Sequence, residues 1–182
     1  MSDYLALFRT FDGRIGRKQF WLGVLGLAVA YLVVSILILP LLGFGQFNMA
    51  SISSSEDAEA TSRAFVATAQ RSIWATLVLN IVFAYPTLAL GLKRRHDRDS
   101  SGKDLIAYYV LALLLVLSQA FGIGYVTTDI GNGVMIPTPG TVATALSTIV
   151  GLLGLYLLVV LGFLRGTKGP NSYGPDPLGG GA

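Results

Sequence analysis

Four long stretches without a charged residue or histidine constrain this chain more than any other feature. They cover residues 20–44, 72–92, 105–125 and 141–164, and they hold 25, 21, 21 and 24 residues. A helix of roughly 20 apolar residues crosses a hydrocarbon core about 30 Å thick. Four such lengths in a chain of 182 residues therefore predict an all-α, polytopic membrane protein, with four transmembrane helices in a single domain over residues 1–182.

Basic residues lie unevenly between the predicted spans. Eleven of the 13 Lys and Arg residues lie in segments 1–19, 93–104 and 165–182, and only Arg63 and Arg71 lie elsewhere. Such residues concentrate on the cytoplasmic side of membrane proteins. We therefore expect residues 1–19 and the tail 165–182 to be cytoplasmic, so that both termini face the cytoplasm. This placement accounts for the net charge of +3 without a nucleic-acid partner.

The ionisable side chains offer little for catalysis or metal binding. The chain has no cysteine and a single histidine, His96, which is followed by Asp97. Zinc sites use three or four protein ligands, which this pair does not supply. No nucleophile stands near His96 at motif spacing. We predict no catalytic residue, no metal and no cofactor, and therefore a protein that is not an enzyme.

Patterns within and between the spans predict how the helices begin and pack. Acidic residues from Glu56 onward favour a helix that runs into the second span. Gly26 and Ala30, like Ser147 and Gly151, stand four apart, and small residues let helices approach closely in lipid. We expect both pairs to pack inside the bundle. Segment 126–140, rich in glycine and proline, is expected to form turns.

Three polar clusters lie at the ends of the spans, all on the side predicted to be cytoplasmic. They are Gly13–Trp21, Lys93–Gly102 and Gly166–Pro177. In order, they resemble the motifs of the bacterial membrane proteins grouped as domain of unknown function 805. The resemblance covers nearly the whole chain, and its matching residues are Gly13, Arg14, Arg17, Phe20, Trp21, Lys93, Arg94, His96, Asp97, Ser101, Gly102, Gly169, Asn171, Tyr173, Gly174, Asp176 and Pro177.

The resemblance implies a small, multi-pass protein of the bacterial inner (plasma) membrane without an assigned activity. It also implies that the tail folds back beneath the bundle, with Asn171, Tyr173 and Asp176 as partners for the arginines. The middle cluster and the residue that follows it depart from the family pattern at four positions. Lys93 replaces the usual first arginine, Arg95 a leucine, Asp99 a glycine and Lys103 a tryptophan.

Two interpretations of the clusters stand beside each other. In the structural one, the cations anchor the helix ends at the headgroups and pair with Asp97 or Asp176. In the functional one, a basic face binds an anionic lipid headgroup or the acidic segment of a partner protein, since arginine suits phosphate. The residues assigned to this lipid- or anion-binding site are Arg14, Arg17, Trp21, Arg94 and His96.

A third hypothesis is a small transporter or channel. Ion pathways usually place ionisable residues within the membrane, and the four predicted spans contain none. A pore would therefore need several copies of the chain. Membrane lipids, a second copy of the chain and another membrane protein are the partners that the sequence suggests.

Overall fold

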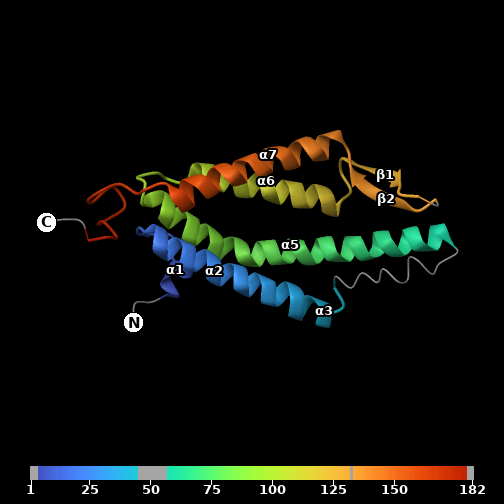
Figure 1. Ribbon diagram of the computed structural model, residues 1–182, viewed down its shortest axis with the longest axis horizontal. Helices are drawn as coiled ribbons and strands as arrows, with labels where there is room; N and C mark the ends of the chain where they lie inside the picture. Colours follow the sequence, from blue (N-terminus) through green and yellow to red (C-terminus); the bar gives the residue numbers. More distant parts are fainter. Residues whose placement is uncertain (1–3, 45–56, 132, 180–182) are drawn as a thin grey trace. The chain divides into compact units, whose positions relative to one another are not determined.

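The computed structural model describes residues 4–44, 57–131 and 133–179, which form helices and one small sheet (Figure 1). The helices are α1 (Ala6–Arg9), α2 (Arg17–Val33), α3 (Leu39–Leu41), α5 (Ala58–His96), α6 (Lys103–Ala120) and α7 (Thr141–Leu158). Two π-helical segments, η1 (Val34–Ile38) and η2 (Val159–Phe163), follow α2 and α7. The strands β1 (Tyr125–Asp129) and β2 (Met135–Pro139) lie between α6 and α7.

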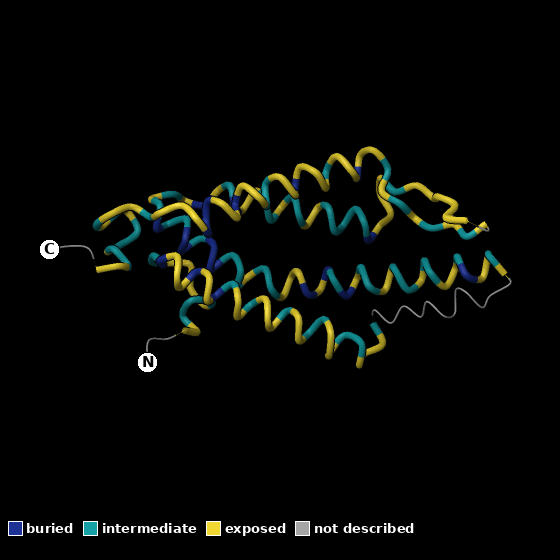
Figure 2. The backbone as a smooth tube through the Cα atoms, viewed as in Figure 1, coloured by how far each residue is buried: buried dark blue, intermediate teal, exposed yellow. Residues whose placement is uncertain are grey.

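Four of the helical segments are long and apolar enough to cross a membrane. They are Arg17–Leu41, Ala58–His96, Lys103–Ala120 and Thr141–Phe163. Many of their large apolar side chains are exposed, such as those of Leu25 and Ile36, at 61% and 64%. Figure 2 marks exposed residues along these helices in yellow. A soluble monomer rarely carries so much exposed apolar surface. The predicted fold class, an all-α polytopic membrane protein, is confirmed.

Two helices end before the charge-free stretches do, and a glycine follows the end of each. Predicted spans reached residues 44 and 125, whereas α3 ends at Leu41 and α6 at Ala120. Gly43 and Gly122 follow these ends with φ of 80° and 66°. In both, the amide after the glycine donates to the carbonyl five residues earlier, at 2.9 and 2.8 Å. This is the glycine-dependent Schellman ending of a helix, which hydropathy alone does not reveal.

The segment expected to form turns is a β-hairpin: the turn lies at its tip, where the amide of Val134 donates to the carbonyl of Gly131 at 3.1 Å, and strands flank it. β1 and β2 pair antiparallel, with Thr127 opposite Pro137 and Tyr125 opposite Pro139. The prolines alternate with Thr138, so their missing N–H groups fall on the outer edge of β2, where no ladder bond is lost. The amide of Met135, on the same edge, donates to Ser62 of α5 at 2.9 Å. The hairpin is thereby tied to α5.

α5 begins close to where the acidic residues predicted a helix. The Asp57 Oδ1 accepts hydrogen bonds from the amides of Glu59 and Ala60, at 2.9 and 3.2 Å. These bonds satisfy amides that lack a partner in the first turn. The helix then continues to His96, so the expected extension beyond the second span is confirmed. Glu56 itself lies outside the described residues.

The chain divides into two compact units. Unit 1 comprises Met1–Tyr31, Ile81–Leu111 and Val150–Ala182, and unit 2 comprises Leu32–Asn80 and Ala112–Ile149. Unit 1 contains a buried apolar cluster, beneath the three polar clusters. Its members are Ile15, Phe20, Leu90, Leu105, Leu157 and Leu161.

Close helix packing in unit 1 uses glycines other than the expected ones. Gly23 is buried, and a Cβ placed there would lie 2.6 Å from Leu90. Gly26 and Gly151, by contrast, have nothing within 4 Å of such a Cβ, and Ala30 and Ser147 are exposed. The packing prediction for these two pairs is wrong. Their helices are apolar on every side. The spacing therefore showed which residues share a face of the helix, but not whether that face is turned toward the other helices.

Candidate functional site

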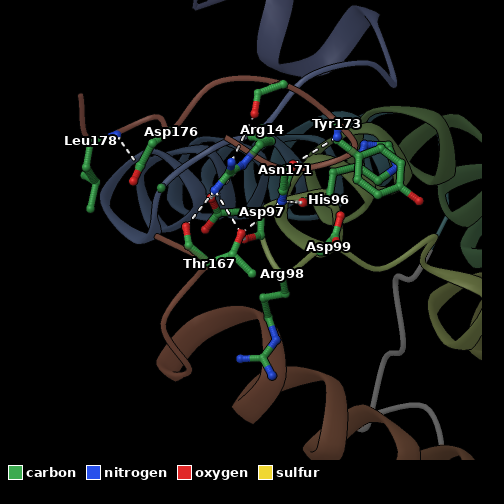
Figure 3. Close-up of polar contacts among 12 residues, drawn as sticks. Arg14, His96, Asp97, Arg98, Asp99, Thr167, Asn171, Tyr173, Asp176 and Leu178 are labelled. Carbon is green, nitrogen blue, oxygen red and sulfur yellow. Dashed lines mark hydrogen bonds and ion pairs between the residues drawn. The ribbon is translucent and has the colours of Figure 1, made fainter. Parts of the chain in front are cut away.

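The three polar clusters meet at one buried residue, Asp97, whose carboxylate binds two arginines and whose backbone carbonyl binds the tail (Figure 3). Its Oδ1 accepts hydrogen bonds from Nε and Nη2 of Arg14, at 3.3 and 3.1 Å. Its Oδ2 accepts one from Nη1 of Arg94. The side chains of Arg14, Arg94 and Asp97 are 1%, 0% and 5% exposed. A buried charge is tolerated when it is paired and hydrogen-bonded, and the shared carboxylate supplies this for both arginines.

Arg14 also binds the backbone of the tail. Its Nη1 donates to the carbonyls of Gly169 and Gly174, at 2.8 and 3.1 Å, and its Nη2 donates to that of Thr167 at 2.8 Å. Together with Asp97, these acceptors engage all five N–H groups of the guanidinium. The tail therefore folds back onto the first cluster, as the resemblance implied.

The tail reaches Asp97 at two successive residues, Gly166 and Thr167, and the first of them has to be glycine. The amide of Thr167 donates to the backbone carbonyl of Asp97 at 2.8 Å, and its hydroxyl donates to the same oxygen at 3.2 Å. A Cβ on the preceding Gly166 would overlap the Asp97 carboxylate. Only glycine lets the chain pass at this distance, which gives a physical reason for glycine at the start of the third cluster.

Side chains from the other two clusters cap the end of η2. The last carbonyls of a helix lack partners within the helix. Here Leu161 and Leu164 accept hydrogen bonds from Nε, at 2.8 Å, and Nη2 of Arg94. Between them, the carbonyls of residues 162 and 163 accept from Nε1 of Trp21, at 3.1 Å, and from Nη1 of Arg17, at 3.3 Å. The cations also suit the negative end of the helix dipole.

His96 takes part in packing the tail. Its ring stacks on Tyr173, with centroids 4.0 Å apart and an interplanar angle of 4°. Its Nδ1 lies 3.2 Å from the carbonyl of Gly13. Asn171 donates to the His96 carbonyl at 2.8 Å and, through its Oδ1, accepts from the amide of Tyr173 at 2.9 Å. The single histidine is thus held between the first cluster and the tail.

Asp99 occupies the position where the family pattern has glycine, and its backbone conformation shows why glycine is usual there. Its φ is 55°, and the next amide donates to the carbonyl of Arg95 at 3.1 Å, which closes the end of α5. Left-handed backbone favours glycine, although Asp tolerates it better than most residues. The Asp99 Oδ1 also accepts a hydrogen bond from the amide of Ser172 at 3.1 Å. The departure therefore keeps the turn and adds a tie to the tail.

Asp176 orders the tail itself. Its Oδ1 accepts from the amide of Leu178, and its Oδ2 from that of Gly169, each at 2.9 Å. These two bonds, in that order, lower the pKa of the carboxyl from its ordinary value. The resemblance implied that Asp176 pairs with arginines, whereas its hydrogen bonds are to backbone amides. The carboxylate closes a loop whose carbonyls then face Arg14.

The structure thus brings all nine predicted site residues into unit 1, but their partners differ from those expected of a lipid site. Arg14 and Arg94 are buried against protein acceptors, and Arg17 and Trp21 bind helix carbonyls. Gly166 and Thr167, which contact Asp97, were not singled out as site residues. In the parts of the chain that the structure describes, no group of three or more His, Cys, Asp or Glu side chains is arranged to hold a metal ion.

Exposed cations surround the same helix end. Arg98 Nη1 donates to the carbonyl of Arg165 at 3.2 Å, two residues beyond the Phe163 carbonyl that Arg17 binds. Arg17 and Arg165 are exposed, and Arg98 is half-buried. Within residues 4–44, 57–131 and 133–179, none of these three guanidinium groups is in an ion pair. We call these three residues the arginine rim.

Comparison with known proteins identifies the family. A family model described as "Protein of unknown function (DUF805)" matches residues 8–175. The match covers the first two polar clusters, the third up to residue 175 and the four long helices, so the chain belongs to this family. No curated protein and no solved structure matches the chain.

Proposed function

We propose that this DUF805 membrane protein binds anionic phospholipid headgroups through the arginine rim and catalyses no reaction. One observation carries the proposal: the guanidinium groups of Arg17 and Arg98 bind the carbonyls of Phe163 and Arg165, so that three arginines meet at this segment of the chain, and none of the three has a carboxylate partner among the described residues. Asp97, the nearby acid, already binds Arg14 and Arg94 on its two oxygens. Cations held together in this way favour an anion between them.

The rim has the chemistry and the neighbours that a lipid phosphate needs. Arg17 and Arg98 each spend one N–H on a backbone carbonyl, which leaves the others of the planar fork for phosphate oxygens. Beside Arg17 lie the rings of Trp21 and Phe163, 38% and 61% exposed and 5.8 Å apart. Aromatic rings are enriched at headgroup depth. This neighbourhood favours a lipid over the acidic segment of a partner protein.

The buried residues of the site have a different role in this proposal. Arg14 and Arg94 hold the tail and η2 in place, and so position the rim without contacting lipid. His96, which a catalytic hypothesis would need, is engaged by Tyr173 and Gly13. We therefore place the anion-binding function on Arg17, with Trp21 beside it, and add Arg98 and Arg165.

The charge distribution supports an orientation in which the rim faces the cytoplasm of a bacterial inner membrane. Eleven basic residues against two is a strong bias, and anionic lipids there would meet the rim. Reporter fusions at Ser100 and at the chain end should therefore read cytoplasmic, and one at Gly131 should read external. Reversed readings would refute this orientation.

The lipid proposal predicts which lipids remain bound after gentle extraction. Native mass spectrometry of the wild type should show retained phosphatidylglycerol or cardiolipin in preference to phosphatidylethanolamine. Combined Arg17→Gln and Arg165→Gln changes should lower this retention at least about tenfold, since hydrogen bonds to charged groups contribute roughly 1.5–3 kcal/mol each.

A matched control removes the same charge elsewhere. The Arg63→Gln and Arg71→Gln pair, also exposed but in unit 2, should retain anionic lipid as the wild type does. Equal loss in both double variants would mean that net charge alone retains the lipid. Unchanged retention in the rim variant would contradict the proposed function.

A further inference from the structure

Residues 4–12, which we call the N-terminal arm, carry apolar side chains on two sides. Leu7 and Phe8 pack against the buried apolar cluster of unit 1. Tyr4 and Leu5, in contrast, are 66% and 56% exposed. One side of the arm is therefore fixed to the protein, and the other leaves large apolar side chains uncovered.

Two side chains of α5 hold the backbone of the arm. The hydroxyl of Tyr85 donates to the carbonyl of Arg9 at 2.7 Å, and its ring contacts that of Phe11, with centroids 5.0 Å apart. The ammonium group of Lys93 donates to the carbonyl of Ala6. Lys93 is buried, and within the described chain it is in no ion pair. The carbonyl of the arm is thus a polar partner for a buried cation.

The exposed face of α5 ends where the arm begins. Ile81, Tyr85 and Ala89 are spaced by four residues and so share one face of the helix. Along this row the exposed fraction falls from 59% to 50% and then to 0%. Phe11, which contacts Tyr85, is itself exposed. The apolar surface that α5 presents to lipid is therefore continuous with the arm.

The two anchors also fix the depth of the arm. Tyr85 lies seven residues, or about 10 Å, before the end of the charge-free stretch 72–92, and Lys93 directly follows that end. Segments that lie in the plane of a membrane bury their apolar face about 5–10 Å into the boundary between headgroups and acyl chains. Arg9 is the single charged residue of segment 4–11, and its long side chain can extend to the headgroups. The arm thus has the depth and the composition of a segment at this boundary.

We propose that the N-terminal arm lies in the plane of the membrane and inserts Tyr4 and Leu5 at the boundary between headgroups and acyl chains. The bilayer then covers the outer side of the arm, as it covers the adjoining face of α5. Continuity with that face favours lipid over a partner protein as the covering surface. The interaction uses apolar side chains and acyl chains rather than arginine and phosphate, so this inference is independent of the arginine rim.

The test measures the depth of the arm in a bilayer. Because the chain has no cysteine, Leu5→Cys in the full chain can carry a single thiol-linked fluorophore. Phosphatidylcholine vesicles have no net charge, so reconstitution in them makes the result independent of the arginine rim. A lipid with a nitroxide near its headgroup should quench this fluorophore at least about twofold more than a lipid with the nitroxide near the chain end.

Ser172→Cys, exposed in the tail, is the matched control, and both lipids should quench its fluorophore only weakly. A Leu5→Cys fluorophore that neither lipid quenches would show that the arm faces water or another protein. Stronger quenching from the chain end would place the arm deep in the hydrocarbon. Either result, or equal quenching at the two positions, would overturn the proposal.

A second measurement tests the anchors on α5. Tyr85→Phe combined with Lys93→Met removes both donors to the carbonyls of the arm but keeps side chains of similar size. The mobile fraction of a nitroxide on Leu5→Cys should then rise at least about fivefold, because two hydrogen bonds are lost. The control, Tyr156→Phe with Lys103→Met, removes the same groups from exposed residues of α7 and α6 and should leave the mobility unchanged. Equal mobility in all three proteins, or an equal rise in both variants, would refute the proposed anchoring.

Discussion

Replacing Asp97 by Asn is expected to destabilise the protein by about 3–5 kcal/mol, the cost of leaving a buried charge without its partner. The variant keeps the size of the side chain but leaves Arg14 and Arg94 without their shared carboxylate. Both guanidinium groups are at most 1% exposed, so water cannot replace it. Equilibrium unfolding in bicelles would measure the loss.

Asp12→Asn is the matched control for this change. Asp12 is exposed and belongs to the same N-terminal segment as Arg14. Its replacement should alter the free energy of unfolding by less than about 0.5 kcal/mol, as is usual for surface positions. Equal effects of the two substitutions would show that Asp97 is not the centre of the site.

Arg94→Gln is expected to be similarly damaging, by about 3–5 kcal/mol. It removes the donors to the carbonyls of Leu161 and Leu164 and leaves Asp97 with Arg14 alone. Arg94→Lys should not rescue stability, because one ammonium group cannot reproduce the planar fork that reaches three acceptors. Bicelle unfolding again measures the effect, with the exposed Arg165→Gln as a near-neutral control.

The two damaging changes should not be additive. Once Asp97 is replaced, Arg94 has already lost one of its acceptors, so the double variant should be less destabilised than the sum of the single ones. Contacting residues in one network couple by about 0.5–3 kcal/mol. Additive effects would mean that the buried ion pair contributes nothing of its own.

The membrane fold was predictable because it depends on a physical property that the sequence displays directly. A stretch such as 141–164 without a charge has few stable places other than lipid, and the structure has a helix there. The rotation of each helix was not predictable in this way. Gly26 and Gly23 look alike in an apolar helix, and only the position of Leu90 makes one of them the packing residue.

The hairpin and the site show a second limit. The prolines of β2 were interpreted as a sign of turns. They fit a strand because they occupy every second position, where the N–H group points away from β1 and no hydrogen bond between the strands is lost. The polar clusters contain Arg14, Arg94 and Asp97, which the structure joins by hydrogen bonds. Their acceptors are mostly backbone carbonyls, at Leu161 or Gly169 for example, and the sequence does not show which carbonyls a fold leaves without partners.

The buried and the exposed arginines of the site are connected through the chain. Arg14 lies three residues before Arg17, and Arg165 immediately precedes Gly166, which passes against Asp97. The buried ion pairs therefore set the positions of the rim residues. On this account, loss of Asp97 should weaken lipid binding as a consequence of a disordered rim.

Amide hydrogen exchange tests most directly whether the tail is bound to Asp97 and Arg14. The amide of Thr167 donates to the backbone carbonyl of Asp97 at 2.8 Å, and the amide of Gly169 donates to the carboxylate of Asp176 at 2.9 Å. In the wild type we expect both to exchange at least about a hundredfold more slowly than in a free peptide, and in Asp97→Asn we expect most of this protection to be lost. Exchange of the wild-type tail at free-peptide rates would contradict the account.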